Sequence, residues 1–285
     1  MRLVARLPTA QITERGVTQE GREMLFAVSG LMGCPVRASD GDVGAVKDFL
    51  FDDQTWKIRW MAVATGHWLP GRQVMIHPSA IAPLEVPPKP RLPMMSMSER
   101  LELTVNLTRA QIEAGPHAPQ DDPVSMDMEA LLYDYYGWDP YWGETHFGAA
   151  ALPNAEQRIV ADAAPRDPDV LSVDGGERLH SVPALKGYYV HALDGDIGHV
   201  DNVLADDANW EIHYLVIATR NWWPGKVVQL APYAVKDIDW LGHHMNMNVT
   251  RDQVRSAPAW DPLAMADEVS DEQLHRHFGW PGYGW

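Results

Sequence analysis

The 285-residue sequence contains a single cysteine, Cys34. One thiol cannot form an intramolecular disulfide, a Cys-x-x-Cys redox pair or a cysteine-rich zinc site. A chain without disulfides is simplest to place in a reducing compartment, so we expect a cytoplasmic protein.

Long apolar segments are also missing. The longest apolar stretches, such as residues 60–64, fall far short of the roughly 20 residues that cross a bilayer. The first six residues carry positive charge but lead into polar and charged residues instead of an apolar segment. The sequence therefore predicts neither a transmembrane helix nor a secretion signal.

Positive charge is scarce. Lysine and arginine number 23 against 39 aspartate and glutamate residues, which gives a formal net charge of −16. Such a chain repels the phosphates of nucleic acids, so direct nucleic-acid binding is disfavoured and basic partner surfaces are favoured. Hydrophobic residues make up 46% of the chain and charged residues 22%, the balance of a globular protein.

Catalytic motifs are absent from the sequence as well. It has no Gly-x-Ser-x-Gly elbow, phosphate-binding loop, His-Glu-x-x-His pair or dinucleotide fingerprint. Cys34 stands beside Pro35 and is replaced by Tyr188 in the related segment described next, which favours a structural thiol over a nucleophile. We expect a protein that is not an enzyme and needs no cofactor.

What the chain does contain is an internal repeat. Residues 26–81 align without a gap on residues 180–235, and 23 of the 56 positions are identical, where chance gives roughly one in twenty. The similarity resumes further on, where 105–109 matches 247–251 and 136–138 matches 278–280. The organisation predicted is an N-terminal extension (1–25), a first repeat (26–147), a linker (148–178) and a second repeat (179–285).

Each repeat begins with strand signals and ends with helix signals. Asp40-Gly41 and Asp194-Gly195 favour tight hairpin turns, and further short strands follow at the spacing of a small barrel or sandwich. Three segments have the pattern of helix-capping boxes, and they begin at Thr108, Thr250 and Ser270. Two glycines, Gly137 and Gly279, stand where helices are expected to end. We expect a mainly β protein with short helices (α+β), whose aromatic tails at 135–142 and 278–285 fold back over the barrels or a partner.

The order of these turns along the sequence resembles that of the PRC-barrel domain family. The resemblance rests on residues 31–44, 51–56 and 65–72 and on their counterparts in the second repeat. It implies two tandem small β-barrels, each followed by two short helices and an aromatic tail. Members include the cytoplasmic part of the photosynthetic reaction-centre H subunit and the C-terminal domain of a ribosome-maturation factor, which bind proteins or membrane complexes and share no catalytic centre.

The two Trp-x-Pro-Gly-basic turns are the leading candidate for partner binding. They place an indole beside a cation, the composition of an interface hot spot. The alternative is a tryptophan that covers the end of the barrel while the cation is solvated. The candidate residues are Trp68, Arg72, Trp222, Trp223 and Lys226.

Metal binding is a weaker hypothesis, and we expect no metal. The acidic corners at Asp40, Asp42, Asp52 and Asp53 and at Asp194, Asp196, Asp206 and Asp207 could bind Ca²⁺ or Mg²⁺, but Asp in such turns commonly caps backbone amides. The histidines of the second half, with His191, His199 and His213 as weak candidates, could bind zinc. A two-residue Asp194-Gly195 loop would place His191 opposite Gly198 and His199 opposite Val190, with the two rings on opposite faces; a three-residue loop would bring them together.

The function favoured by these patterns is a cytoplasmic protein-binding scaffold or adaptor. Two alternatives stay open: a module that binds a small molecule or metal ion in the crevice between the repeats, and a peripheral component of a membrane electron-transfer complex of the reaction-centre kind. We expect the repeats to be related by a pseudo-twofold axis or to pack through their tails. The sequence does not identify the protein partner, and it leaves a homo-oligomer open.

Overall fold

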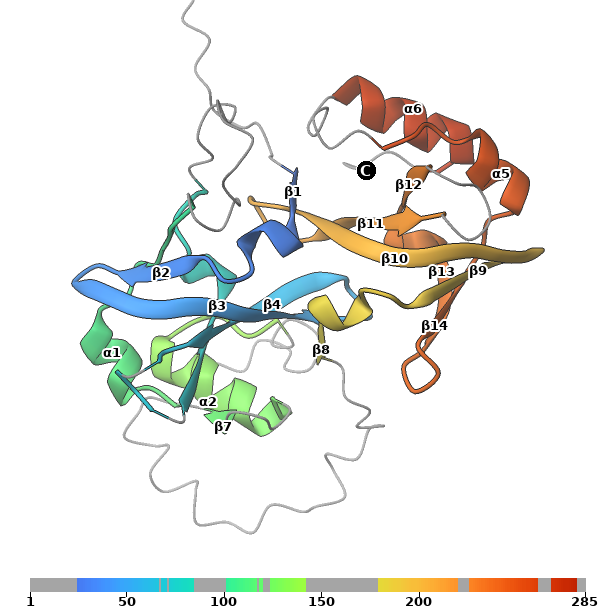
Figure 1. Ribbon diagram of the computed structural model, residues 1–285. Coiled ribbons are helices and arrows are strands. Elements are labelled where there is room, and N and C mark those ends of the chain that lie inside the picture. The colour runs from blue at the N-terminus through green and yellow to red at the C-terminus, as the bar shows by residue number, and fades with distance from the viewer. Residues whose placement is uncertain are drawn as a thin grey trace, which may run out of the picture.

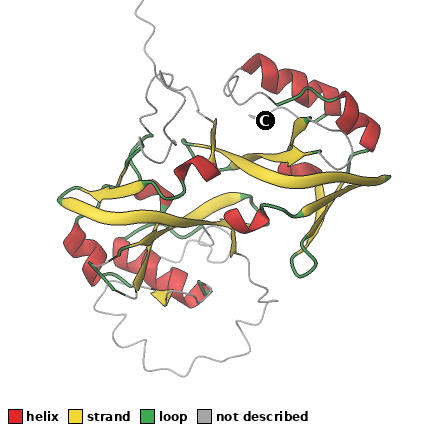
Figure 2. Ribbon diagram, in the orientation of Figure 1, coloured by secondary structure: helices red, strands yellow, loops and turns green. Residues whose placement is uncertain are grey.

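The structure is a computed structural model. It describes residues 25–66, 68–70, 72–84, 101–116, 118–119, 124–141, 179–219, 226–260 and 268–280. Two multi-stranded sheets form its centre and short helices lie at its periphery (Figure 2), which confirms the prediction of a mainly β protein.

The first sheet is built mostly from the first repeat. Its strands run in the order β6-β2-β3-β4-β5-β7, where the bounds are β2 (Pro35–Ala38), β3 (Gly41–Asp52), β4 (Lys57–Ala64), β5 (Arg72–Ile76), β6 (Leu103–Thr104) and β7 (Ala118–Pro119). The helical segments of this repeat are η1 (Val28–Leu31), η2 (Pro78–Ala80), α1 (Arg109–Ala114) and α2 (Met126–Tyr136).

The second sheet repeats this plan. Its strands run in the order β12-β11-β10-β9-β14-β13, where the bounds are β9 (Tyr189–Ala192), β10 (Gly195–Asp206), β11 (Ile212–Ala218), β12 (Val227–Leu230), β13 (Val235–Asp239) and β14 (His244–Met247). The helical segments of this repeat are η4 (Pro183–Leu185), η5 (Pro232–Ala234), α5 (Arg251–Ser256) and α6 (Glu268–Phe278).

The two repeats exchange their first strands. β1 (Leu25–Ala27) opens the first repeat but pairs with β10 of the second, and β8 (Leu179–Ser181) opens the second repeat but pairs with β3 of the first. Each sheet therefore has seven strands, one of them from the other repeat. In Figure 1 the long strands β3 and β10 cross the middle of the molecule, with α1 and α2 on one side and α5 and α6 on the other.

Backbone contacts at the centre are reciprocal. The amide of Ile58 donates to the carbonyl of Trp210 at 2.9 Å, and the amide of the equivalent Ile212 donates to the carbonyl of Trp56 at 2.8 Å. Lys57 and Glu211, which are also equivalent, lie 3.9 Å apart as an ion pair. Because equivalent residues contact each other, a pseudo-twofold axis passes between them, in agreement with one of the two arrangements predicted.

One continuous apolar core runs through both repeats. It includes Trp210, whose ring meets Phe26 edge-on at a centroid distance of 5.3 Å and stacks on Phe49 at 5.7 Å. A smaller cluster under α2 contains Trp60, Met75 and Leu132. The described parts of the aromatic tails fold back over their own repeats: Trp138 packs near Trp60, and the ring of Trp280 meets that of Tyr233 edge-on at 5.2 Å. Residues 142 and 281–285 of the predicted tails lie outside the described residues.

Two of the three predicted capping boxes are confirmed. Thr108 caps α1 and Thr250 caps α5, each with the reciprocal glutamine contact. The third prediction is wrong, because α6 begins at Glu268 and Ser270 therefore lies inside the helix. The C-cap glycine is confirmed for α2, where Gly137 is left-handed, and Gly279 also has positive φ just after α6.

The predicted hairpins form, but their turns lie one residue earlier than expected. Ala38 pairs with Gly41 and Ala192 pairs with Gly195, so the loops are Ser39-Asp40 and Leu193-Asp194. A register shift follows between Asp196 and Gly198, where the strand carries an extra residue. The predicted partner of His191 is therefore wrong: it lies opposite Asp196, and His199 lies opposite Tyr189.

Closure of either sheet into a barrel is not seen in the strand pairing. Among the described residues, the terminal strands β6 and β7 of one sheet and β12 and β13 of the other do not pair with each other. The tandem barrel thus stays a prediction. No helix within the described part of the chain is long and apolar enough to cross a bilayer.

Candidate partner-binding surface

The first Trp-x-Pro-Gly turn is largely built into the fold. Trp68 is half-buried against the core, and the Arg109 guanidinium lies 4.3 Å from its ring centroid. The buried Thr65 hydroxyl lies 2.9 Å from the Leu69 carbonyl, which holds the turn closed. Arg72 is exposed, so this turn matches the alternative in which tryptophan covers the end of the barrel while the cation is solvated.

The equivalent cation in the second repeat has a structural role. The Lys226 ammonium donates to the carbonyl oxygens of Val254 at 3.3 Å and Ala257 at 2.6 Å, and also to that of Arg255. These carbonyls lie at the C-terminal end of α5, where a cation offsets unpaired acceptors and the helix dipole. Burial lowers the pKa of Lys226. Trp222 and Trp223 lie outside the described residues.

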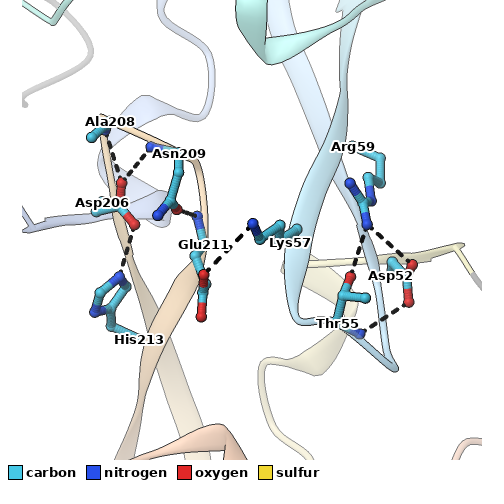
Figure 3. Close-up of polar contacts among 9 residues, drawn as sticks. All are labelled: Asp52, Thr55, Lys57, Arg59, Asp206, Ala208, Asn209, Glu211 and His213. Atoms are coloured by element: carbon cyan, nitrogen blue, oxygen red, sulfur yellow. Dashed lines mark hydrogen bonds and ion pairs between the residues drawn. The ribbon is translucent and has the colours of Figure 1, made fainter. Parts of the chain in front are cut away.

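The acidic corners are turns, as one reading of the sequence predicted. Asp52 accepts from the amides of Gln54 and Thr55, and Asp206 accepts from those of Ala208 and Asn209. Figure 3 shows the contact of Asp52 with Thr55 and those of Asp206 with Ala208 and Asn209. Asp40 and Asp194 in turn accept from the first amides of α1 and α5, those of Arg109 and Arg251.

Two of the three candidate histidine ligands, His191 and His213, are engaged elsewhere. His213 is buried and its Nε2 lies 2.7 Å from Oδ2 of Asp206, while His191 contacts Asp196. Burial would raise the pKa of Asp206, but the hydrogen bond from His213 and those from the turn amides outweigh it and lower the pKa. No group of three or more His, Cys, Asp or Glu side chains among the described residues is placed to hold a metal ion.

The thiol of Cys34 and two methionines of β14 pack in the core. Cys34 is fully buried, its thiol lies 3.5 Å from the Gly30 carbonyl, and burial raises its pKa. Met245 and Met247 are buried on β14. The structural interpretation of Cys34 is thus confirmed.

A buried carboxylate that sequence reasoning missed anchors α2. The Trp60 indole donates to Oε1 of Glu129 at 2.6 Å, and the Tyr141 hydroxyl donates to Oε2 at 3.3 Å. Burial raises the pKa of Glu129, although both hydrogen bonds and the nearby Arg59 lower it. Nothing in the local sequence distinguishes Glu129 from a solvent-exposed glutamate in a first helical turn, where acidic residues are common.

A crevice between the repeats was expected, and the structure identifies its lining. Its volume is about 260 Å³. One wall is the β3–β4 turn of the first repeat and the other is β13 and its following turn; the lining residues are Asp53, Gln54, Trp56, Val235, Lys236, Asp237, Ile238 and Trp240. The Trp240 indole stacks on His180 at 3.5 Å, and Nε2 of His180 lies 3.3 Å from Oδ2 of Asp53.

Exposed apolar side chains of the second repeat lie on β9 and in the turns that follow β9 and β13. Leu193 is 65% exposed at the β9–β10 turn, Tyr189 is 53% exposed on β9, and Leu241 is 98% exposed at the β13–β14 turn. The His244 ring on β14 stacks against two rings of β9, with centroid distances of 5.5 Å to Tyr189 and 5.1 Å to His191. We call these five residues the β9–β14 face. Sequence reasoning missed it because isolated apolar residues in turns give no periodic signal.

No protein-family model matches the chain, and no curated protein matches it in sequence.

Proposed function

We propose that the protein is a non-catalytic, cytoplasmic scaffold of the tandem PRC-barrel type that binds a basic protein through the β9–β14 face. The observation that carries the proposal is the exposure of Tyr189 on β9, of Leu193 at one end of the β9–β14 pair and of Leu241 at the other. Large apolar side chains left exposed along one surface commonly mark a docking site.

The charge around this face selects the partner. Four exposed aspartates surround it: Asp194, Asp196, Asp237 and Asp239. The whole chain carries a formal charge of −16. An apolar patch in an acidic field favours a partner with apolar anchors inside a basic rim, and it steers that partner during encounter.

The rigidity of the fold suits a scaffold. The exchanged strands β1 and β8 and the shared core join the repeats, so the face does not move independently of the first repeat. A preorganised surface loses less conformational entropy on binding.

Paired variants test the proposal. Leu193→Ser combined with Leu241→Ser removes two anchors of the face, while Met126→Ser combined with Leu131→Ser removes similarly exposed side chains, 51% and 58%, from α2. We expect affinity capture with cross-linking to recover a basic partner on the natural chain and the α2 variant, with at least tenfold less on the face variant. Recovery should also fall as salt rises from about 50 to 500 mM.

Two results would contradict it. Equal recovery of the partner by the two variants would move the site off this face. Recovery of an acidic partner, or recovery that is insensitive to salt, would remove the electrostatic part of the proposal.

A further inference from the structure

We infer that the outer edge of β13 accepts an extended, lysine- or arginine-containing peptide as an additional strand, with one basic side chain inserted into the crevice between the repeats. This inference rests on the proposed function, because it specifies how a basic partner would engage the second repeat.

The edge itself is the first argument. β13 is the last strand of its sheet and pairs on its inner side with β14, from Val235 opposite Met247 to Asp239 opposite His244. No strand in the described part of the chain pairs with its outer side. An unpaired strand edge offers alternating backbone donors and acceptors, which is the template for strand addition.

The crevice lies along this edge. Val235, Lys236, Asp237 and Ile238 of β13 form one wall, and the turn that contains Asp53 and Trp56 forms the other. A strand added to β13 would direct alternate side chains to opposite sides, so that one of them faces the crevice. A volume of about 260 Å³ is of the size that a single long side chain requires.

The walls of the crevice are held in place. Trp56 has a left-handed backbone, φ 56°, which is fixed by its amide donating to Asp52 at 2.7 Å and its carbonyl accepting from Ile212. Trp240 is held by stacking on His180 and by the Tyr188 hydroxyl, which donates to its carbonyl at 3.3 Å. A fixed pair of indoles binds a side chain without first having to order itself.

The lining favours a cation. The lining contains two carboxylates, Asp53 and Asp237, and one ammonium, that of the exposed Lys236. Nε2 of His180 lies 3.3 Å from Asp53, and the Asn246 amide donates to Asp237 at 2.6 Å. Indole rings attract guanidinium and ammonium groups through their faces. An arginine or lysine side chain therefore fits both the charge and the aromatic character of the walls, whereas an acidic side chain would meet repulsion.

The site should be occupied once per chain. Within the described part of the chain the pseudosymmetric indole, Trp210, is closed off, since it is 5% exposed and packs between Phe26 and Phe49. At the positions equivalent to these two phenylalanines the second repeat has His180 and Val203, and His180 stacks on Trp240.

Fluorescence anisotropy with a labelled seven-residue peptide of alternating lysine and valine, blocked at both ends, tests the inference on the full chain. We expect saturable binding at one peptide per chain and none for the glutamate-valine peptide. Asp53→Asn combined with Asp237→Asn should weaken binding about tenfold, while Asp42→Asn, which neutralises a carboxylate that is 88% exposed on the far hairpin, should change it less than twofold.

Backbone methylation separates strand addition from charge attraction. Two further peptides carry N-methyl groups on every lysine or on every valine, which blocks one or the other edge of the peptide. We expect one of the two to lose at least tenfold in affinity. Equal binding of both methylated peptides, or equal losses in the crevice and Asp42→Asn variants, would overturn the inference.

The outcome is distinguishable from that of the proposed function. If the peptide fails to bind but a basic protein is still captured through Leu193 and Leu241, the scaffold proposal stands and strand addition does not.

Discussion

At Gly198, β10 passes very close to β11. A Cβ atom on this residue would lie 2.1 Å from the Ala218 carbonyl oxygen, and the equivalent Gly44 would meet Ala64 at 2.0 Å. Both glycines are part of the repeat, and their conservation between the two copies reflects this backbone contact. A glycine in a strand often marks such a close approach.

Gly198→Ala should therefore destabilise the protein by more than about 3 kcal/mol, because backbone must move to make room. Gly187→Ala is the matched control: its φ of 91° is also strained for alanine, but nothing lies within 4 Å of the added Cβ. We expect the control to cost about 1 to 2 kcal/mol. Urea unfolding of the two variants measures the difference, and equal losses would contradict the steric explanation.

His77 introduces a pH dependence. Burial, reinforced by the charge of Arg59, lowers its pKa from 6.5 to about 4. Between these values the unfolded chain binds a proton that the folded chain does not, so stability falls as pH drops from about 6.5 to 4. The loss attributable to His77 should reach roughly 3 kcal/mol.

Comparison with His77→Asn isolates this contribution, since asparagine can still cap η2 but does not titrate. The difference in unfolding free energy between the two proteins should change across this pH range. The raised pKa of Glu129 acts in the opposite direction in both proteins and cancels in the comparison. Parallel pH curves would show that His77 is not the group responsible.

At the scale of single elements, the C-terminal end of α5 depends on the side chain of Lys226, which lies just before β12. Lys226→Met removes the ammonium that donates to the last carbonyls of the helix, and we expect a loss of about 1 to 2 kcal/mol. Arg72→Met changes the equivalent residue of the first repeat, which is exposed, and should cost less than about 0.5 kcal/mol. Thermal unfolding of both variants tests whether equivalent sequence positions have different roles.

Local signals predicted the elements better than their partners. Capping boxes at Thr108 and Thr250 and the hairpins near Asp40 and Asp194 follow from contacts within a few residues, and all four form. The hairpin loops lie one residue earlier than predicted, and in the second repeat the strand then carries an extra residue near Ile197. Such a bulge leaves no mark in the alternation of apolar residues, so the sequence did not indicate the register.

The site was harder to predict for the same reason. Lys226 matched the composition of a docking cation, yet its partners lie about thirty positions away on α5. The crevice joins Trp56 to Trp240, and no sequence pattern relates these two residues.

For the molecule as a whole, the exchange of β1 and β8 determines the unit of stability. A three-residue strand such as Leu25–Ala27 could pair with equivalent edges in either repeat, which is why the sequence did not reveal the exchange. Because each sheet contains a strand of the other repeat, the repeats should unfold together.

Scanning calorimetry should accordingly show one transition, with equal calorimetric and van't Hoff enthalpies. Phe26→Ala, which removes the contact of β1 with Trp210, should lower the midpoint by several degrees without splitting the transition, at a cost of about 3 to 4 kcal/mol. Two resolved transitions in either protein would contradict a single cooperative unit.

The exchange also has a consequence for synthesis on the ribosome. The first sheet receives β8 only after residue 181 has been translated, although its other strands end by residue 119. Until then the nascent chain presents the edge of β3 near Asp52 without its neighbour, and such an edge is prone to pair wrongly. The rate at which residues 120–181 emerge from the ribosome thus sets how long the unfinished first half needs protection from other nascent chains.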